Sequence, residues 1–81
     1  MSNGGMPLTL ASHGKMLRVT AINSGCGLQR WLADMGLTTG IQISVINGRY
    51  AGPVLIDVRG SRLGLGRGVA QKISVKENKD G

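Results

Sequence analysis

Side chains suited to metal or acid–base chemistry are scarce in this chain of 81 residues. It has one histidine, one cysteine and four carboxylate side chains. A metal site needs several such ligands close together, and acid–base catalysis needs at least a matched pair. No ligand-spacing motif or catalytic triad can be assembled from their scattered positions, which are His13, Cys26, Asp34, Asp57, Glu77 and Asp80. We therefore expect no metal site, no stably bound cofactor and no enzyme activity.

Three segments come nearest to a chemical motif, and each has a simpler interpretation. Cys26 lies in Ser-Gly-Cys-Gly just before a predicted helix, where a helix N-terminus could activate a thiol, but a structural loop cysteine is more common. His13 has no acid or nucleophile near it in the sequence, which favours a solvated loop histidine. Gly64-Leu-Gly-Arg-Gly68 has Val69 where the dinucleotide-binding fingerprint needs a third glycine, so nucleotide binding is rejected.

Positive charge is concentrated in the second half of the chain. The formal net charge is +6, and residues 47–76 alone carry +5 because their only acidic residue is Asp57. Such a flank suits nucleic acid, an anionic membrane surface or an acidic partner, and an ordinary solvated surface explains it equally well. The aromatic residues are only Trp31 and Tyr50, which disfavours base stacking and an SH3-type groove for proline-rich peptides.

The elements that must position these residues are short. Alternating apolar residues predict a strand from Lys15 to Ile22 and another over residues 41–45, which the turn signal Asn47-Gly48 ends. The segment from Leu28 to Met35 instead has helical spacing, with Leu28, Trp31, Leu32 and Met35 on one stripe. A helix this short is not stable alone, so the stripe must pack on a core. Gly36 suits the left-handed position that ends a helix.

Two further strands form a predicted hairpin over residues 54–65. With Arg59-Gly60 as a two-residue turn, apolar residues pair on one side and Asp57 faces Arg62 on the other. The apolar side then holds Val58 opposite Ser61, Ile56 opposite Leu63, and Val54 opposite Leu65. The glycine-rich segment 66–72 predicts a tight turn rather than a helix, and Ile73 and Val75 predict a last short strand.

Five strands and one inserted helix predict a small, mainly β fold, an SH3-like barrel whose closure removes exposed strand edges. We expect the folded domain to span residues 7–77, with flexible tails at 1–6 and 78–81. No run of residues is long and apolar enough for a membrane span or a secretory signal, and the lone cysteine fits a reducing compartment. We therefore expect a cytoplasmic location.

A larger pattern runs through these elements from Leu8 to Val75 and resembles the ferrous iron transport protein A family, FeoA. The resemblance is carried by Leu28-Gln-Arg-Trp-Leu-Ala-Asp-Met-Gly-Leu37 with Gly40, Gly52-Pro53-Val54, Val58-Arg-Gly-Ser-Arg-Leu63, Leu65-Gly-Arg-Gly-Val-Ala70 and Ile73-Ser-Val75. Two departures concern Trp31, where the family often has a basic residue, and the loop 47–53, which varies within the family. Both lie where a partner could be discriminated.

The resemblance implies an SH3-like barrel with an inserted helix that acts beside FeoB, a membrane transporter that imports Fe(II) and carries a cytosolic G-protein domain. The same type of barrel is the C-terminal domain of iron-dependent repressors, but this chain has no room for their other domains. Members of the family are commonly labelled as binding transition metals. Because no ligand set is evident here, we expect Fe(II) to be at most a transient ion of the pathway.

The resulting hypothesis is a non-enzymatic accessory that is recruited to the inner face of the membrane, docks on FeoB and supports its assembly or activity. Trp31, Met35 and Leu37 would form an apolar anchor, although capping the core is the more common role for a residue placed like Trp31. Basic side chains would steer the encounter. The remaining candidate partner-binding residues are Arg49, Tyr50, Arg59 and Arg67. The alternative hypothesis is a small basic nucleic-acid-binding barrel.

Overall fold

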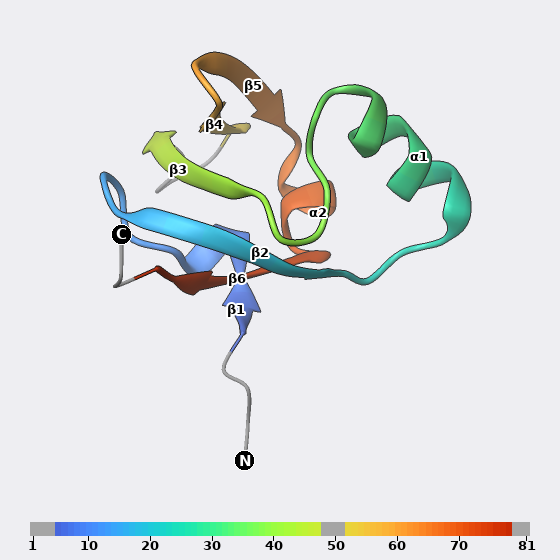
Figure 1. The fold of residues 1–81 in the computed structure, drawn as a ribbon, viewed down its shortest axis with the longest axis horizontal. Helices are drawn as coiled ribbons and strands as arrows, with labels where there is room; N and C mark the ends of the chain where they lie inside the picture. The colour runs from blue at the N-terminus through green and yellow to red at the C-terminus, as the bar shows by residue number, and fades with distance from the viewer. Residues whose placement is uncertain (1–4, 48–51, 79–81) are drawn as a thin grey trace.

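Six strands form one antiparallel sheet in the part of the chain that the computed structural model describes, residues 5–47 and 52–78. Their order across the sheet is β1-β6-β2-β3-β4-β5 (Figure 1). In chain order the elements are β1 (Met6–Pro7), the short 3₁₀ helix η1 (Leu8–Leu10), β2 (Met16–Ile22), α1 (Cys26–Asp34), β3 (Gln42–Asn47), β4 (Val54–Val58), β5 (Ser61–Leu65), α2 (Arg67–Ala70) and β6 (Ile73–Glu77).

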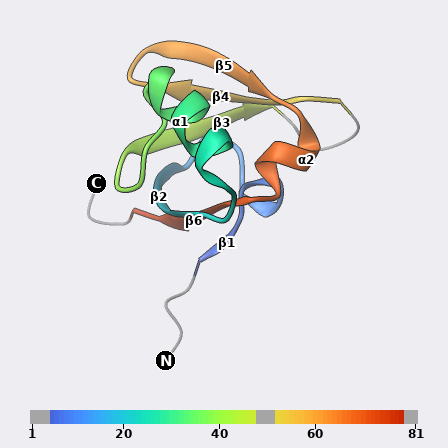
Figure 2. The same ribbon diagram turned by 90° about the vertical axis from the view of Figure 1, so that its right-hand side faces the viewer.

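The sheet has one face on the core and one in solvent. In β2, Leu17 and Val19 are buried whereas Met16 and Arg18 are exposed, as the alternating sequence predicts. The pairing shifts by one residue between Val19 and Ala21 against β6, and a second shift lies in β3 against β4. Such bulges increase the local twist, and the strands curl around the core (Figure 2).

The hairpin of β4 and β5 confirms the predicted register, with Val58 opposite Ser61 and Asp57 opposite Arg62. Its turn has φ values of 55° at Arg59 and 89° at Gly60, the left-handed pair of a type I′ turn. The Asp57 carboxylate accepts a hydrogen bond from the Gly60 amide at 2.8 Å. The turn therefore matches the right-handed twist of its two strands.

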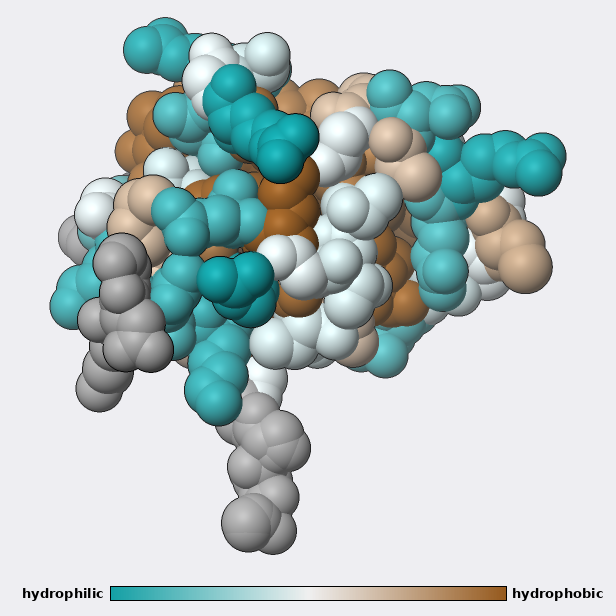
Figure 3. Space-filling view, in the orientation of Figure 1, coloured by the Kyte–Doolittle hydropathy of each residue, from teal (hydrophilic) through white to brown (hydrophobic). Residues whose placement is uncertain are grey.

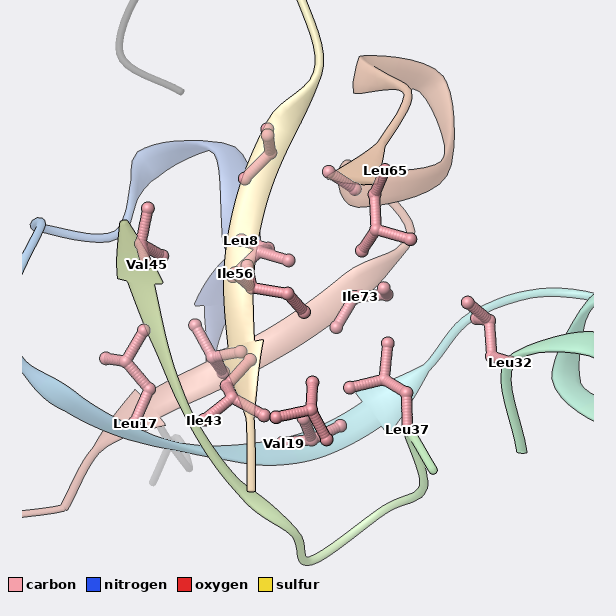
Figure 4. Packing of buried hydrophobic residues seen from close by; sticks show 14 residues of the cluster. Leu8, Leu17, Val19, Leu32, Leu37, Ile43, Val45, Ile56, Leu65 and Ile73 are labelled. Atoms are coloured by element: carbon pink, nitrogen blue, oxygen red, sulfur yellow. The ribbon is translucent and has the colours of Figure 1, made fainter. Parts of the chain in front are cut away.

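The core is one cluster to which the long strands, both helices and η1 contribute (Figure 4). No polar or charged residue is buried among the residues that the structure describes. Helix α1 contributes Leu32, and the segment that follows it contributes Leu37, both fully buried. Because α1 lies at one end of the sheet, these two side chains attach it to the core (Figures 1 and 4).

The segment 66–72, expected to be a tight turn, contains one turn of α-helix. The amide of Ala70 donates to the Gly66 carbonyl and that of Gln71 to the Arg67 carbonyl, both at 2.9 Å. Ala70 is fully buried. The helical turn places Ala70 in the core while the chain passes from β5 to β6, on the other side of the sheet. The glycine-rich sequence of this segment does not reveal the helical turn.

The N-terminal part of the fold differs from expectation at Met6. The sequence predicts a flexible tail at this residue, but it lies in β1. It pairs with Val75, and Pro7 pairs with Ser74, which adds a sixth strand. The next residue, Leu8, is buried in η1, where the amide of Ala11 donates to the Leu8 carbonyl at 3.1 Å. A two-residue strand is too short to show an alternating pattern, so only the pairing with β6 defines it.

The fold is the expected mainly β, SH3-like one, but hydrogen bonds do not close its sheet among the described residues. Strands β1 and β5 stand at opposite ends of the strand order. Between these edges, η1 and α2 contact each other, and their buried residues Leu8 and Ala70 belong to the common core. Side-chain packing therefore completes the barrel where strand pairing does not.

Candidate functional site

Helix α1 is held in place at both of its ends. At the start, the side-chain amide of Gln29 donates to the carbonyls of Ile22 and Ser24, at 3.1 and 3.0 Å. At the end, the Gly36 amide donates to Ala33 and the Leu37 amide to Leu32, both at 2.9 Å, with φ of 90° at Gly36. This pair of bonds is the Schellman motif, which needs a residue tolerant of positive φ.

The structure separates the three residues of the expected apolar anchor. Trp31 is 50% exposed on α1, so about half of its surface is accessible to a partner. Met35 is half-buried and packs against the core cluster. Leu37 is fully buried, so its assignment as a docking residue is wrong. The Schellman motif accounts for the burial of Leu37. In this motif the residue after the glycine commonly makes an apolar contact with the helix residue whose carbonyl accepts its amide hydrogen bond, here Leu32.

Of the expected basic and aromatic partners of this anchor, the structure describes Arg59 and Arg67, which lie on different elements. Arg59 is exposed and lines a hollow with Gly36, Thr38 and Thr39, the segment that leaves α1. Arg67 is half-buried at the start of α2 and donates to the Gly52 carbonyl at 3.3 Å. Of the two candidate cations within the described residues, Arg59 is thus the one placed beside the α1 segment. Arg49 and Tyr50 lie outside the described residues.

A second hollow, absent from the sequence-based candidates, adjoins the first one on the outer face of the sheet. Residues from β2, β3, β4 and the β4–β5 turn line it, and both hollows share Gly40, Ile41 and Arg59. The guanidinium of Arg18 lies here and donates to the Gly40 carbonyl at 2.7 Å. The alternation of β2 places Arg18 on the solvent face, so the sequence held a signal for it.

Large exposed apolar side chains are few among the described residues, namely Leu10, Met16, Trp31 and Ile46. Figure 3 shows one side of the molecule, where hydrophilic residues predominate and hydrophobic patches lie exposed between them. The hollow beside Leu10 is formed by residues 8–13 together with Val45 and Val54. Trp31 differs from the other three because it stands on a helix that is joined to the core by only a few side chains.

The residues considered for chemistry remain dispersed in the fold. Within residues 5–47 and 52–78, no group of three or more histidine, cysteine or acidic side chains could hold a metal ion. Cys26 is exposed in the first turn of α1, and His13 is half-buried beside Val45. Among the described helices, none has the length and hydrophobicity to span a bilayer. The best-defined site is therefore the surface formed by α1 and the two hollows next to Arg59.

The model of the FeoA domain matches residues 6–77, the same range over which strands β1 to β6 and α1 are arranged. The chain belongs to the FeoA family. A protein of Methanocaldococcus jannaschii that is named as an Fe(2+) transport protein A is 39% identical to this chain over 71 residues. The match covers 88% of this chain and 85% of that protein. The expected family is thereby confirmed.

Solved structures agree with this FeoA assignment. The crystal structure of an iron uptake regulatory protein, FeoA, has a TM-score of 0.82 and 32% identity, and the match covers 93% of this chain and 99% of that one. A manganese-dependent transcriptional repressor has a TM-score of 0.84 at 21% identity, with 96% of this chain matching 44% of the repressor. At that identity the repressor shows a shared fold alone.

Proposed function

We propose that this FeoA-family protein is a cytoplasmic accessory of ferrous iron uptake that docks on the membrane transporter FeoB and supports its assembly or activity. The names of its relatives, Fe(2+) transport protein A and iron uptake regulatory protein, support the pathway. The main support for docking is the exposure of Trp31. This residue lies on α1 and half of its surface is in solvent. Exposed tryptophans are frequent energetic centres of protein interfaces.

The surface around Trp31 has the composition of a small interface. Half-buried Met35 adds a flexible apolar side chain at the end of the same helix, and Arg59 lies beside the segment that leaves it. A cation at the rim speeds the encounter with an acidic partner, whereas the apolar centre supplies most of the affinity. Fe(II) is the cargo of the transporter in this proposal, and no residue of the described chain is assigned to hold it.

The test is to replace Trp31 by glutamate and measure binding to the cytosolic domain of FeoB from the same organism, with and without guanine nucleotide. We expect Trp31→Glu to weaken binding at least tenfold, because truncating a central aromatic anchor typically costs about 2 kcal/mol or more. Ala33→Glu is the matched control, since Ala33 is exposed on the same helix but points away from Trp31. It should bind as the wild type does.

Both variants are first compared with the wild type by circular dichroism and by amide NMR spectra. A folded Trp31→Glu protein that still binds both the cytosolic domain and full-length FeoB in nanodiscs at wild-type affinity would overturn the proposed docking surface. Loss of Fe(II) uptake in cells that carry Trp31→Glu, but not in those that carry Ala33→Glu, would connect the surface to transport.

The alternative, a nucleic-acid-binding barrel, has weaker support. Trp31 is the only aromatic residue in the described ranges, and it lies on α1 rather than beside the cationic strand residues Arg18 and Lys76. Single-stranded nucleic acid is usually held by aromatic stacking in addition to charge. The face of the sheet that carries Arg18 and Lys76 therefore suits an anionic ligand that binds without aromatic stacking.

A further inference from the structure

We propose that the outer face of the sheet, over β2, β3 and the β4–β5 turn, binds an acidic segment of a protein partner, with Arg18 and Arg59 receiving its carboxylates. The groove is the hollow lined by these two arginines together with Met16, Gln42, Ser44 and Asp57. If the partner is FeoB, this inference rests on the proposed function. The groove lies on a different face from Trp31, although Arg59 belongs to both surfaces, and binding to it can be measured without the transporter.

The first argument is the pairing of strands, which arranges the cations in a row. Arg18 of β2 stands opposite Gln42 of β3 and, on its other side, opposite Lys76 of β6. On the other side of β3, Ile43 stands opposite Val58 of β4. Because these strands are antiparallel, the next residue, Arg59, lies beside Gln42, on the opposite side of β3 from Arg18. Arg18 and Arg59 therefore lie about two strand spacings apart, roughly 10 Å between backbones.

The second argument is that the fold accepts two unfavourable arrangements to keep these cations. Arg18 and Lys76 are like charges directly opposite each other on neighbouring strands, which opposes pairing. Arg59 has φ of 55°, at a turn position where asparagine or glycine is preferred. None of the three cations is needed by the core, because all three side chains are exposed. Residues held in an unfavourable backbone conformation, as Arg59 is, are frequent at binding sites.

The third argument concerns the state of the charges in the groove. One nitrogen of the Arg18 guanidinium is held by the Gly40 carbonyl at 2.7 Å, which fixes the group while leaving its other donors free to face a ligand. The carboxylate of Asp57 is the acidic group in the groove lining, and one of its oxygens already accepts the Gly60 amide. Within the described residues, the guanidinium of Arg59 makes no hydrogen bond or ion pair.

The shape and lining favour a peptide over other anionic ligands. The face is hollowed rather than flat, and it combines guanidinium groups with exposed Met16 and half-buried Ile41. An extended peptide places alternate side chains about 6.7 Å apart on one face, a span that two long arginine side chains can meet. Carboxylates at alternate positions would bind the arginines through paired hydrogen bonds, and the backbone would cross β3.

The probe is a ten-residue peptide in which glutamate alternates with alanine, compared with the same peptide carrying glutamine. Titration of the full chain, followed by amide NMR, should shift the resonances of Arg18, Gln42, Ser44 and Gly60 with the glutamate peptide alone. Arg59→Asn should weaken this binding at least about fivefold and should also raise the Tm by roughly 2–4 °C, because asparagine suits the positive φ. A mutation that stabilises the fold while weakening binding cannot act by unfolding it.

Lys72→Gln is the matched control, because it removes the same charge from an exposed residue outside the groove. The proposal is overturned if the glutamate and glutamine peptides bind alike, or if Lys72→Gln weakens binding as much as Arg59→Asn does. It is also overturned if phosphatidylserine vesicles, but not the peptide, shift the groove resonances. A wild-type response of the Trp31→Glu variant to the peptide would confirm that the two surfaces act separately.

Discussion

At the scale of single residues, Trp31 and Leu37 show how one short segment serves both the core and the surface. Both are apolar and belong to the α1 region, yet Leu37 is fully buried and Trp31 is 50% exposed. The difference follows from the helix end, where Gly36 turns the chain, the Leu37 amide donates to the Leu32 carbonyl and the Leu37 side chain enters the core. The apolar stripe of the helix alone does not contain this information.

This arrangement predicts a large effect on stability from the end of α1 and a small one from its outer side. Leu37→Ala should lower the free energy of unfolding by about 2–5 kcal/mol, the usual cost of emptying a leucine site in a core. Gly36→Ala should lower it by about 1–2 kcal/mol, because φ of 90° is unfavourable for a residue with a β-carbon. The added methyl meets only Val58, at 3.8 Å, so the backbone is the source of the cost.

Urea denaturation measures both values, with Trp31→Ala as the comparison. Its side chain is half in solvent, so we expect a change of less than about 1.5 kcal/mol. If Trp31→Ala were as destabilising as Leu37→Ala, the tryptophan would be part of the core and the docking surface would have to be placed elsewhere.

At the scale of elements, α1 is the least firmly held of the larger ones. The central strands β2, β3 and β4 are paired on both sides. Helix α1 is instead attached by a few apolar side chains of the helix and its C-terminal end and by the Gln29 side chain; the apolar ones are Leu28, Leu32, Met35 and Leu37. Segments with few such attachments open locally at a lower free energy than the whole molecule. If α1 docks as proposed, the helix can adjust to a partner without disturbing the sheet.

Hydrogen exchange should therefore show lower protection in α1 than in β2 and β3. Gln29→Ala removes both side-chain hydrogen bonds to Ile22 and Ser24 and should lower the protection of α1 by a further 0.5–1.5 kcal/mol, approximately the net value of exposed hydrogen bonds. The protection of β3 should stay unchanged. Equal loss of protection in the helix and the central strands would mean that the two unfold together.

At the scale of the whole molecule, one barrel presents two different faces. The α1 side offers an exposed aromatic residue, and the outer face of the sheet offers a row of cations. The manganese-dependent repressor shares the fold over 44% of its own length, so the barrel itself does not define a function. The surface residues of the barrel must carry that information.

The two faces should respond differently to salt. Binding of a nonspecific oligonucleotide depends on counterion release and should weaken by about tenfold or more between 50 and 200 mM salt. The proposed binding of FeoB through Trp31 would bury apolar surface, so its affinity should change by less than about threefold. Fluorescence anisotropy with a labelled oligonucleotide and with the FeoB domain, at the same salt concentrations, makes the comparison. Oligonucleotide affinity that persists at 200 mM salt would favour the nucleic-acid alternative.

The main strands, the helix and the pairing of the hairpin could be predicted from the sequence, because each depends on local periodicity or on a two-residue turn such as Arg59-Gly60. The family was predicted from a resemblance in sequence motifs. The sequence also indicated an excess of positive charge. Only the tertiary structure decided that Leu37 is in the core, that Met6 pairs with Val75 and that α2 is helical, since these depend on which distant residues pack together. The groove has the same origin, because only the pairing of β2, β3 and β6 brings Arg18, Lys76 and Arg59 onto one face.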